Sequence, residues 1–384
     1  MAWDAYKMEQ QRLQLVLAYI NKEASMTSLC TQYRISRKTG YKWVERYQEY
    51  GENGLKDLSR APNSPNQAYK DEIIFRAIDF KLLKRKWGPK KIAYKLRELY
   101  PEEYWPSSSR LHQIFKEYHL IKSRKLRGHL PATAAIGDCS DCNDTWCVDR
   151  KGWFLTGDGH KCEPLTITDC TSRYAISCEH LSKHTLEYVW PVFEEAFREN
   201  GLPDRVRTDN GPPFGSVGVG RLTKLSVNLI KAGVIPEWIR PAHPEENGRH
   251  ERFHLTLQIE TADPPQGTLA LQIQEMKRFL EEYNFERPHE ALGMKTPGSI
   301  YLPSKRIWDG ILRSPEYDRT EMDVRKVGLS GTIWIKQTQY YIGESLIGEY
   351  VGLKTNEDEE LEVYYGPIYL GKIRLGIGFE RPKL

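Results

Sequence analysis

The sequence predicts a multidomain chain with an all-α N-terminal part, an α/β central part and a small all-β C-terminal part. Apolar residues recur at helical spacing as far as residue 119. Between residues 145 and 302, short apolar strands alternate with amphipathic helices, which is typical of an α/β layer arrangement. After residue 320 the apolar residues follow a period of two in short runs, which indicates strands.

These patterns divide the chain into four domains and three linkers. The segment 59–68 contains two prolines and no apolar period, so it is expected to be a linker. The expected segments are a first helix-turn-helix domain (1–58), a linker (59–68), a second helix-turn-helix domain (69–131), a linker (132–144), the α/β core (145–302), a linker (303–319) and the β-domain (320–384).

The composition is that of a soluble protein. The chain has 384 residues, which is enough for several domains with cores of their own. No apolar run approaches the roughly 20 residues that a membrane span requires. The first residues lack the basic start and apolar run of a signal peptide, so we expect a cytoplasmic protein with no membrane partner.

The first domain is predicted to be a helix-turn-helix. Its expected helices are Glu9–Glu23, Ser25–Tyr33 and Arg37–Tyr50, with Ser36 capping the third and Gly51 ending it. The alternative is a plain three-helix bundle with no DNA-binding role. The third helix is expected to contact DNA through Arg37, Lys38, Tyr41, Lys42 and Arg46, with Trp43 among them.

The second domain repeats this pattern with helices expected at Asp71–Lys84, Lys90–Tyr100 and from Pro106 to His119. Its basic residues are clustered, which indicates a polyanionic partner, whereas the alternative for any single run is a solvated helix face. The expected DNA contacts are Lys90, Lys91, Ser107, Ser108, Arg110 and His112, followed by Arg124, Lys125 and Arg127 in the basic segment beyond.

Three acidic residues of the core stand where a metal site can form. Asp149 ends the short strand Trp146–Asp149, and Asp209 follows the strand Arg205–Thr208. Glu251 projects from the first turn of a helix expected at Arg249–Ile259. Carboxylate oxygens of this kind suit Mg²⁺.

These motifs resemble a known family. Asp149, Thr208-Asp209-Asn210-Gly211 and Asn247-Gly248-Arg249-His250-Glu251 resemble the acidic triad of the DDE transposases and integrases. More narrowly, Ser172-Arg173-Tyr174 and His250–His254 resemble bacterial insertion-sequence transposases whose core is similar to retroviral integrase. The resemblance covers nearly the whole chain.

The resemblance implies an RNase H-like catalytic core and a C-terminal β-barrel similar to the SH3-like domain of integrases. It implies that Asp149, Asp209 and Glu251 hold two Mg²⁺ ions, with Mn²⁺ as a possible substitute, for phosphodiester cleavage followed by strand transfer. Asn210, Asn247 and His254 would orient these ligands or the scissile phosphate. The implied partners are double-stranded DNA, as transposon ends and target, and further copies of the chain in a dimer or larger assembly at the bacterial nucleoid.

Several alternatives stay open. The separation of Asp209 and Glu251, 251 − 209 = 42 positions, is longer than the commonest integrase-like pattern, so Glu245 and Glu246 are rivals for the third ligand. The chain could also be a DNA-binding regulator without catalysis, or a nuclease that does not join ends. Cys139 and Cys142 have metal-like spacing, but a lone Cys-x-x-Cys without a second half is weak support for zinc.

Overall fold

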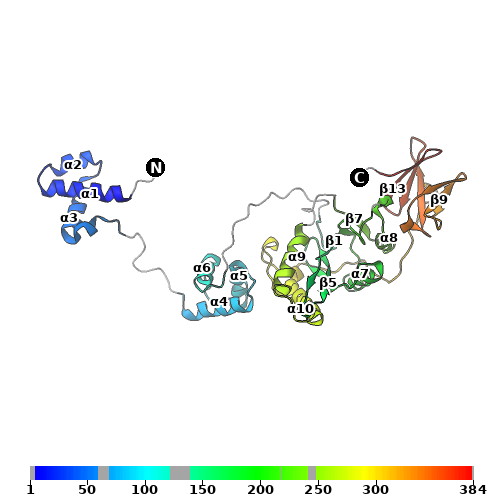
Figure 1. The fold of residues 1–384 in the computed structure, drawn as a ribbon, viewed down its shortest axis with the longest axis horizontal. Helices are drawn as coiled ribbons and strands as arrows, with labels where there is room; N and C mark the ends of the chain where they lie inside the picture. The colour runs from blue at the N-terminus through cyan, green and yellow to red at the C-terminus, as the bar shows by residue number, and fades with distance from the viewer. Residues whose placement is uncertain (1–4, 59–68, 122–138, 217, 241–247, 383–384) are drawn as a thin grey trace. The chain divides into compact units, whose positions relative to one another are not determined.

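The computed structural model describes residues 5–58, 69–121, 139–216, 218–240 and 248–382. The chain forms two compact units, Met1–Lys70 and Asp71–Leu384, and each is described by itself (Figure 1). None of the helices in these ranges has the length and apolar character needed to cross a membrane. The expected linker at 59–68 lies outside the described residues.

The first unit contains α1 (Ala5–Ile20), α2 (Met26–Gln32), α3 (Arg37–Tyr50) and a short 3₁₀ turn, η1 (Gly51–Leu55). The predicted ends of α3 are confirmed. The Ser36 hydroxyl accepts a hydrogen bond from the Thr39 N–H at 3.1 Å, and Gly51 ends the helix with a φ of 62°.

The expectation that Trp43 faces DNA is wrong. Its side chain is only 6% exposed and packs in the core of the first unit with Val44 and Leu15. Arg12 lies over its ring, 4.0 Å from the centroid, so the indole is covered on its outer side as well. The three-helix core needs a large apolar side chain at this position, and α3 turns its exposed face elsewhere.

The second unit begins with α4 (Asp71–Leu83), α5 (Pro89–Leu99) and α6 (Ser108–Glu117), which enclose a core around Trp87 and Trp105. The Ser107 hydroxyl accepts from the Arg110 N–H at 3.2 Å and so caps α6. The predicted second helix-turn-helix therefore has its three helices in the expected places.

The core sheet has five strands in the order β5-β4-β1-β6-β7. Strands β1, β6 and β7 are parallel, whereas β4 runs antiparallel to both of its neighbours, β1 and β5. A small extra hairpin, β2 (Phe154–Leu155) with β3 (Lys161–Cys162), was not predicted. The sheet strands are β1 (Thr145–Arg150), β4 (Pro164–Asp169), β5 (Ala175–His180), β6 (Arg205–Thr208) and β7 (Ile235–Trp238).

Helices cover both faces of this sheet (Figure 1). Trp146, Val148 and Ile167 pack against α7 (Leu186–Asn200) and α8 (Lys224–Lys231). On the other face, Phe253 and Leu257 of α9 (Gly248–Thr261) pack with Phe279 of α10 (Leu269–Glu281) and Ala175 of β5. Alternate residues of β1 and β4 therefore point to different helix layers.

The C-terminal domain is all-β, but its described strands do not close into a barrel. Five strands form a sheet in the order β14-β13-β12-β11-β8, and β9 and β10 pair as a separate hairpin. The strands are β8 (Asp323–Lys326), β9 (Thr332–Ile335), β10 (Thr338–Tyr341), β11 (Tyr350–Thr355), β12 (Leu361–Tyr365), β13 (Ile368–Arg374) and β14 (Gly378–Glu380).

This domain shares one hydrophobic core with the preceding α/β core. Val227 and Ile230 of α8 belong to the same buried cluster as Tyr365 and Leu370 of the β-domain. Close to this cluster, Lys231 Nζ lies 2.8 Å from a Glu349 carboxylate oxygen, and both side chains are largely buried. The two domains are therefore packed together.

Candidate active site

Asp149 and Asp209 lie at the same edge of the sheet. The parallel register of β1 and β6 pairs Thr145 with Arg205 and Cys147 with Arg207. Extending this register by two residues places Asp149 opposite Asp209, at the carboxyl ends of neighbouring strands. This edge is where parallel α/β sheets commonly bind ligands.

The Asp149 carboxylate is an electrostatically strained group. Burial, together with the negative charges of Asp209 and Glu251, raises its pKa to about 6, although the Arg150 backbone N–H donates to Oδ1 at 2.7 Å. Burial also raises the pKa of Asp209, whose Oδ1 accepts from the Gly211 N–H at 3.2 Å. A cation between these carboxylates would relieve their repulsion.

Glu251 lies in the first turn of α9 with an exposed side chain. Leu255 and Gln258 share its exposed face, as their spacing predicts, and the opposite face of α9 is buried. Among the described residues, no three His, Cys, Asp or Glu side chains are close enough together to hold a metal ion. The donors are all carboxylate oxygens, which fits Mg²⁺, while the third member stands at a distance from the pair.

A buried hydrogen-bond network supports Asp149 from the α9 side. The Thr166 hydroxyl of β4 lies 2.6 Å from His250 Nε2, 2.7 Å from His254 Nε2 and 3.1 Å from the Asp149 carbonyl oxygen. The Thr168 hydroxyl lies 2.9 Å from His250 Nδ1. All four supporting side chains are buried.

One set of proton positions satisfies every contact in this network. Thr166 has a single hydrogen, which it donates to the Asp149 carbonyl, so both histidines donate to it through Nε2–H. Thr168 then donates to His250 Nδ1. Burial lowers the pKa of His254 to about 4 and holds that of His250 well below its usual value, so both rings are neutral. The remaining acceptor, His254 Nδ1, lies 3.9 Å from Asp149 Oδ2, which is too long for a direct hydrogen bond.

Asn210 fastens the loop that carries Asp209. Its side-chain amide donates to the Ile239 carbonyl at 2.8 Å, and its Oδ1 accepts from Arg221 at 3.0 Å. Asn210 thus joins the end of β6 to the end of β7, next to the acidic pair. Asn247, together with the rival acids Glu245 and Glu246, lies outside the described residues.

Asp169 and the cysteines hold structural positions. Asp169 Oδ2 accepts from the Ser172 N–H and hydroxyl at 2.7 and 2.6 Å, and Oδ1 accepts from the Asn143 N–H at 2.8 Å. Asp169 is thus a turn carboxylate held by hydrogen bonds. Cys142 Sγ contacts the Ile300 carbonyl at 3.7 Å, and no described set of donors around Cys139 and Cys142 could hold zinc.

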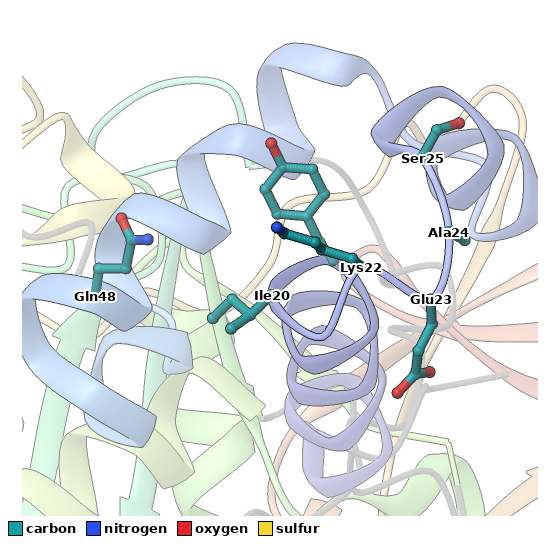
Figure 2. Close-up of a pocket in the computed structure, with 7 residues that line it drawn as sticks. Ile20, Lys22, Glu23, Ala24, Ser25 and Gln48 are labelled. Carbon is teal, nitrogen blue, oxygen red and sulfur yellow. The ribbon is translucent and has the colours of Figure 1, made fainter.

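The predicted DNA-binding residues of the first unit lie on α3. Arg37, Lys38, Tyr41 and Lys42 are exposed there, while Arg46 donates to the Lys56 carbonyl at 2.8 Å. A surface hollow at the end of α1 is lined by Ile20, Lys22, Glu23, Ala24, Ser25 and Gln48, among others (Figure 2). It brings together no group of catalytic side chains.

In the second unit the predicted DNA-binding residues divide into two groups. Ser107, Ser108, Arg110 and His112 stand at the start of α6, with Ser107 and His112 exposed. Lys90 instead pairs with Glu290 at 3.0 Å. Lys91 is half-buried, and burial lowers its pKa to about 8. The expected contacts Arg124, Lys125 and Arg127 lie outside the described residues.

Family models match most of the chain's α-helical and α/β parts. A helix-turn-helix domain matches residues 11–63, and a homeodomain-like domain matches residues 39–115. Two integrase core domain models match residues 141–244 and 232–297. An insertion element IS476 protein of Xanthomonas euvesicatoria is 24% identical over 228 residues, and the transposase InsD of element IS2D in Escherichia coli is 24% identical over 207. Together, these matches support an insertion-sequence transposase with an integrase-like core.

The match covers 59% of this chain and 63% of the IS476 protein, and it covers 50% of this chain and 64% of InsD. An IS407 protein of Burkholderia multivorans is 25% identical over 196 residues, 68% of its length. The catalytic core of HTLV-2 integrase in complex with magnesium aligns with a TM-score of 0.34 at 18% identity, over 42% of this chain and 99% of that one. A chain of the simian T-cell lymphotropic virus intasome aligns with a TM-score of 0.38 at 13% identity. This alignment covers 78% of the present chain and 99% of the intasome chain.

The sequence patterns did not lead to Thr166, Thr168 and His250. Two signals for them were present. Thr166 and Thr168 alternate with the apolar Leu165 and Ile167, so they share one face of β4. His250 and His254 are four residues apart and therefore share one face of α9.

His289 is expected to make the stability of the fold depend on pH. Burial, together with the positive charges of Lys91, Arg287 and Arg173, lowers its pKa to about 3. Because the folded pKa lies below the unfolded value, its stabilising contribution is full above about pH 6.5 and is lost as the pH falls towards 3. Between pH 7 and 4.5 we expect wild type to lose roughly 1 to 3 kcal/mol more unfolding free energy than His289→Gln. Urea unfolding at both pH values measures this difference.

His112→Gln is the matched control, because His112 is exposed on α6. It should follow the wild-type curve at both pH values. Equal losses in wild type and His289→Gln would show that His289 is not the group responsible.

Proposed function

We propose that the protein is a transposase that binds transposon ends, cleaves phosphodiester bonds and joins the 3′ ends to target DNA. The main support is the placement of Asp149 and Asp209 at adjacent strand ends of an integrase core, with the α9 helix of Glu251 packed on the same sheet. Its helix-turn-helix domains add the means to bind DNA. Because two ends must be joined together, we infer a dimer or larger assembly on DNA.

Asp149, Asp209 and Glu251 would hold Mg²⁺, with Mn²⁺ as a substitute. When bound, the metal supplies activation of the attacking oxygen and stabilisation of charge on the leaving oxygen. The Thr166 hydroxyl, which also contacts His254, hydrogen-bonds the Asp149 carbonyl near the end of β1. Asn210 holds the loop of Asp209 through a hydrogen bond to the Ile239 carbonyl. These contacts hold the two aspartates in place before DNA arrives, which lowers the cost of ordering the reacting groups.

The β-domain would take the part that SH3-like domains take in integrases, contacting DNA or another subunit. Its packing on α8 supports a fixed position beside the core. The expected domain boundaries, including the linker at 303–319, remain part of this proposal.

Strand transfer in vitro tests the function. The protein is mixed with pre-cleaved transposon-end DNA, a supercoiled target plasmid and Mg²⁺, and joined products are separated on a gel. We expect joining by wild type and its loss in Glu251→Gln, while Glu245→Gln and Glu246→Gln keep it. Loss in Glu245→Gln or Glu246→Gln alone would move the third ligand to that residue.

Two other outcomes would overturn the proposal. Tight binding without cleavage or joining in Mg²⁺ or Mn²⁺ would favour a DNA-binding regulator. Cleavage without joining would favour a nuclease. Both use the same DNA-binding domains, so only the joined product separates them from a transposase.

A further inference from the structure

The turn between β4 and β5 is held from two sides. On one side, Arg249 of α9 donates to the Cys170 carbonyl at 3.0 Å and lies 3.4 Å from its Sγ. On the other, the Asn284 side chain accepts from the Ala175 N–H at 2.8 Å and donates to the Ala175 carbonyl at 2.9 Å. Arg173 lies within this turn, at a φ of 62°. The turn therefore presents Arg173 between α9 and the segment after α10.

Arg252 adds a second cation from α9. Arg249 and Arg252 are three residues apart, so they share one side of the helix, and Glu251 points away from it. Both arginines are exposed. No carboxylate of the described residues forms an ion pair with Arg173, Arg249 or Arg252. By contrast, Arg207 pairs with Glu237 at 2.7 Å.

The positive charges of these arginines act on one another. Burial lowers the pKa of Arg173, and the charges of Arg249 and Arg252 lower it further. Like charges gathered at one place without carboxylates are costly in the absence of an anion. Such an arrangement is typical of sites that bind phosphate, since guanidinium groups match its oxygens.

A buried polar atom lies next to Tyr283, which packs on α9. His289 is 9% exposed, and its Nε2 has no hydrogen-bond partner among the residues that the structure describes. Its ring meets that of Tyr283 edge to face, 4.7 Å between centroids, and Tyr283 in turn packs on Phe253 of α9 at 5.0 Å. A buried donor or acceptor left unpaired in this way costs free energy unless a ligand or water satisfies it.

We propose that Arg173, Arg249 and Arg252, together with His289, form a binding site for a backbone phosphate of the DNA that enters the active site. Arg252 is adjacent to Glu251 in the sequence. A phosphate bound at this site would therefore hold a DNA strand close to the acidic residues Asp149, Asp209 and Glu251. This inference rests on the proposed function for its ligand. Phosphate contacts of this kind position DNA and read no sequence.

The test is the salt dependence of DNA binding by the full chain. Wild type, Arg252→Gln and the double variant Arg173→Gln/Arg252→Gln bind a fluorescent 40-base-pair duplex of arbitrary sequence, without divalent metal, over a range of NaCl concentrations. We expect the slope of log K against log salt to become shallower by about 1 in the double variant. Arg252→Lys should keep the wild-type slope, because lysine also neutralises a phosphate.

Arg198→Gln is the matched control. Arg198 is an exposed arginine near the end of α7, and it should leave the slope unchanged. An unchanged slope in the double variant, or an equal change in Arg198→Gln, would overturn the proposal. The Arg252 side chain is exposed and has no described partner. We therefore expect Arg252→Gln to fold normally, so this variant tests the site even if the double variant does not fold.

A second arm adds inorganic phosphate at constant ionic strength and follows thermal unfolding. Stabilisation that needs Arg252, together with a wild-type DNA slope in the variants, would assign the site to a free anion instead. Binding is measured here without joining. If the variants change the slope but the wild-type chain never joins ends, the phosphate site stands and the proposed transposase function is wrong. If the chain joins ends but the variants leave the slope unchanged, the function stands and the phosphate site is wrong.

Discussion

Replacing Asp149 or Asp209 by asparagine is expected to reduce strand transfer by on the order of 10³-fold or more, with DNA affinity nearly unchanged. Asparagine keeps the size of the side chain but removes the negative charge that would hold a divalent metal. Both residues stand at the ends of adjacent parallel strands, so neither can replace the other. Joining assays in Mg²⁺ and duplex binding without metal measure the two quantities separately.

Asp204→Asn is the matched control for this expectation. Asp204 precedes β6, is exposed and pairs with Arg306 on the surface. Its loss should leave joining within about twofold, since exposed ion pairs contribute little. Full joining by Asp149→Asn or Asp209→Asn would remove that residue from the catalytic site.

Replacing Leu370 by alanine is expected to destabilise the α/β core and the β-domain together, by about 2 to 5 kcal/mol. Leu370 is fully buried in the cluster that contains Val227 and Ile230 of α8. An ideal Cβ added at Gly220 would approach its Cδ2 to 2.6 Å, which shows how tightly this contact is packed. The cavity left by the leucine therefore opens between the two domains.

Urea unfolding followed by circular dichroism measures this change. Leu329→Ala is the control, because Leu329 is 92% exposed in the same domain and should cost almost nothing. A separate transition for the β-domain, with the core transition unmoved, would contradict the idea of one shared core.

Local signals in the sequence were enough to predict much of this architecture. The ends of α3 follow from Ser36 and Gly51, because capping depends on neighbouring residues alone. The pairing of Asp149 with Asp209 follows from two short strands that each end in an acid. Strand β6 was predicted with the bounds that the structure shows.

The remaining features depend on contacts between distant segments. Thr166 meets His254 only because β4 pairs with β1 and α9 packs across them, which no local pattern encodes. Trp43 looked like a DNA contact because its neighbours are basic, yet the packing of α1 buries it. Likewise, the alternation of apolar residues predicted the strands of the β-domain. It did not predict that these strands pair as a sheet and a separate hairpin, without closing into a barrel.

The two hydrogen bonds between the Asn284 side chain and the Ala175 backbone affect how copies of the core can associate. Strand β5 is an edge of the central sheet, and an edge strand presents unpaired N–H and C=O groups to any other strand. Asn284 occupies both groups of Ala175, so the ladder cannot continue there onto a second molecule. Asn284, which holds the turn that carries Arg173, thus also disfavours edge-to-edge pairing of the sheet with another strand at Ala175.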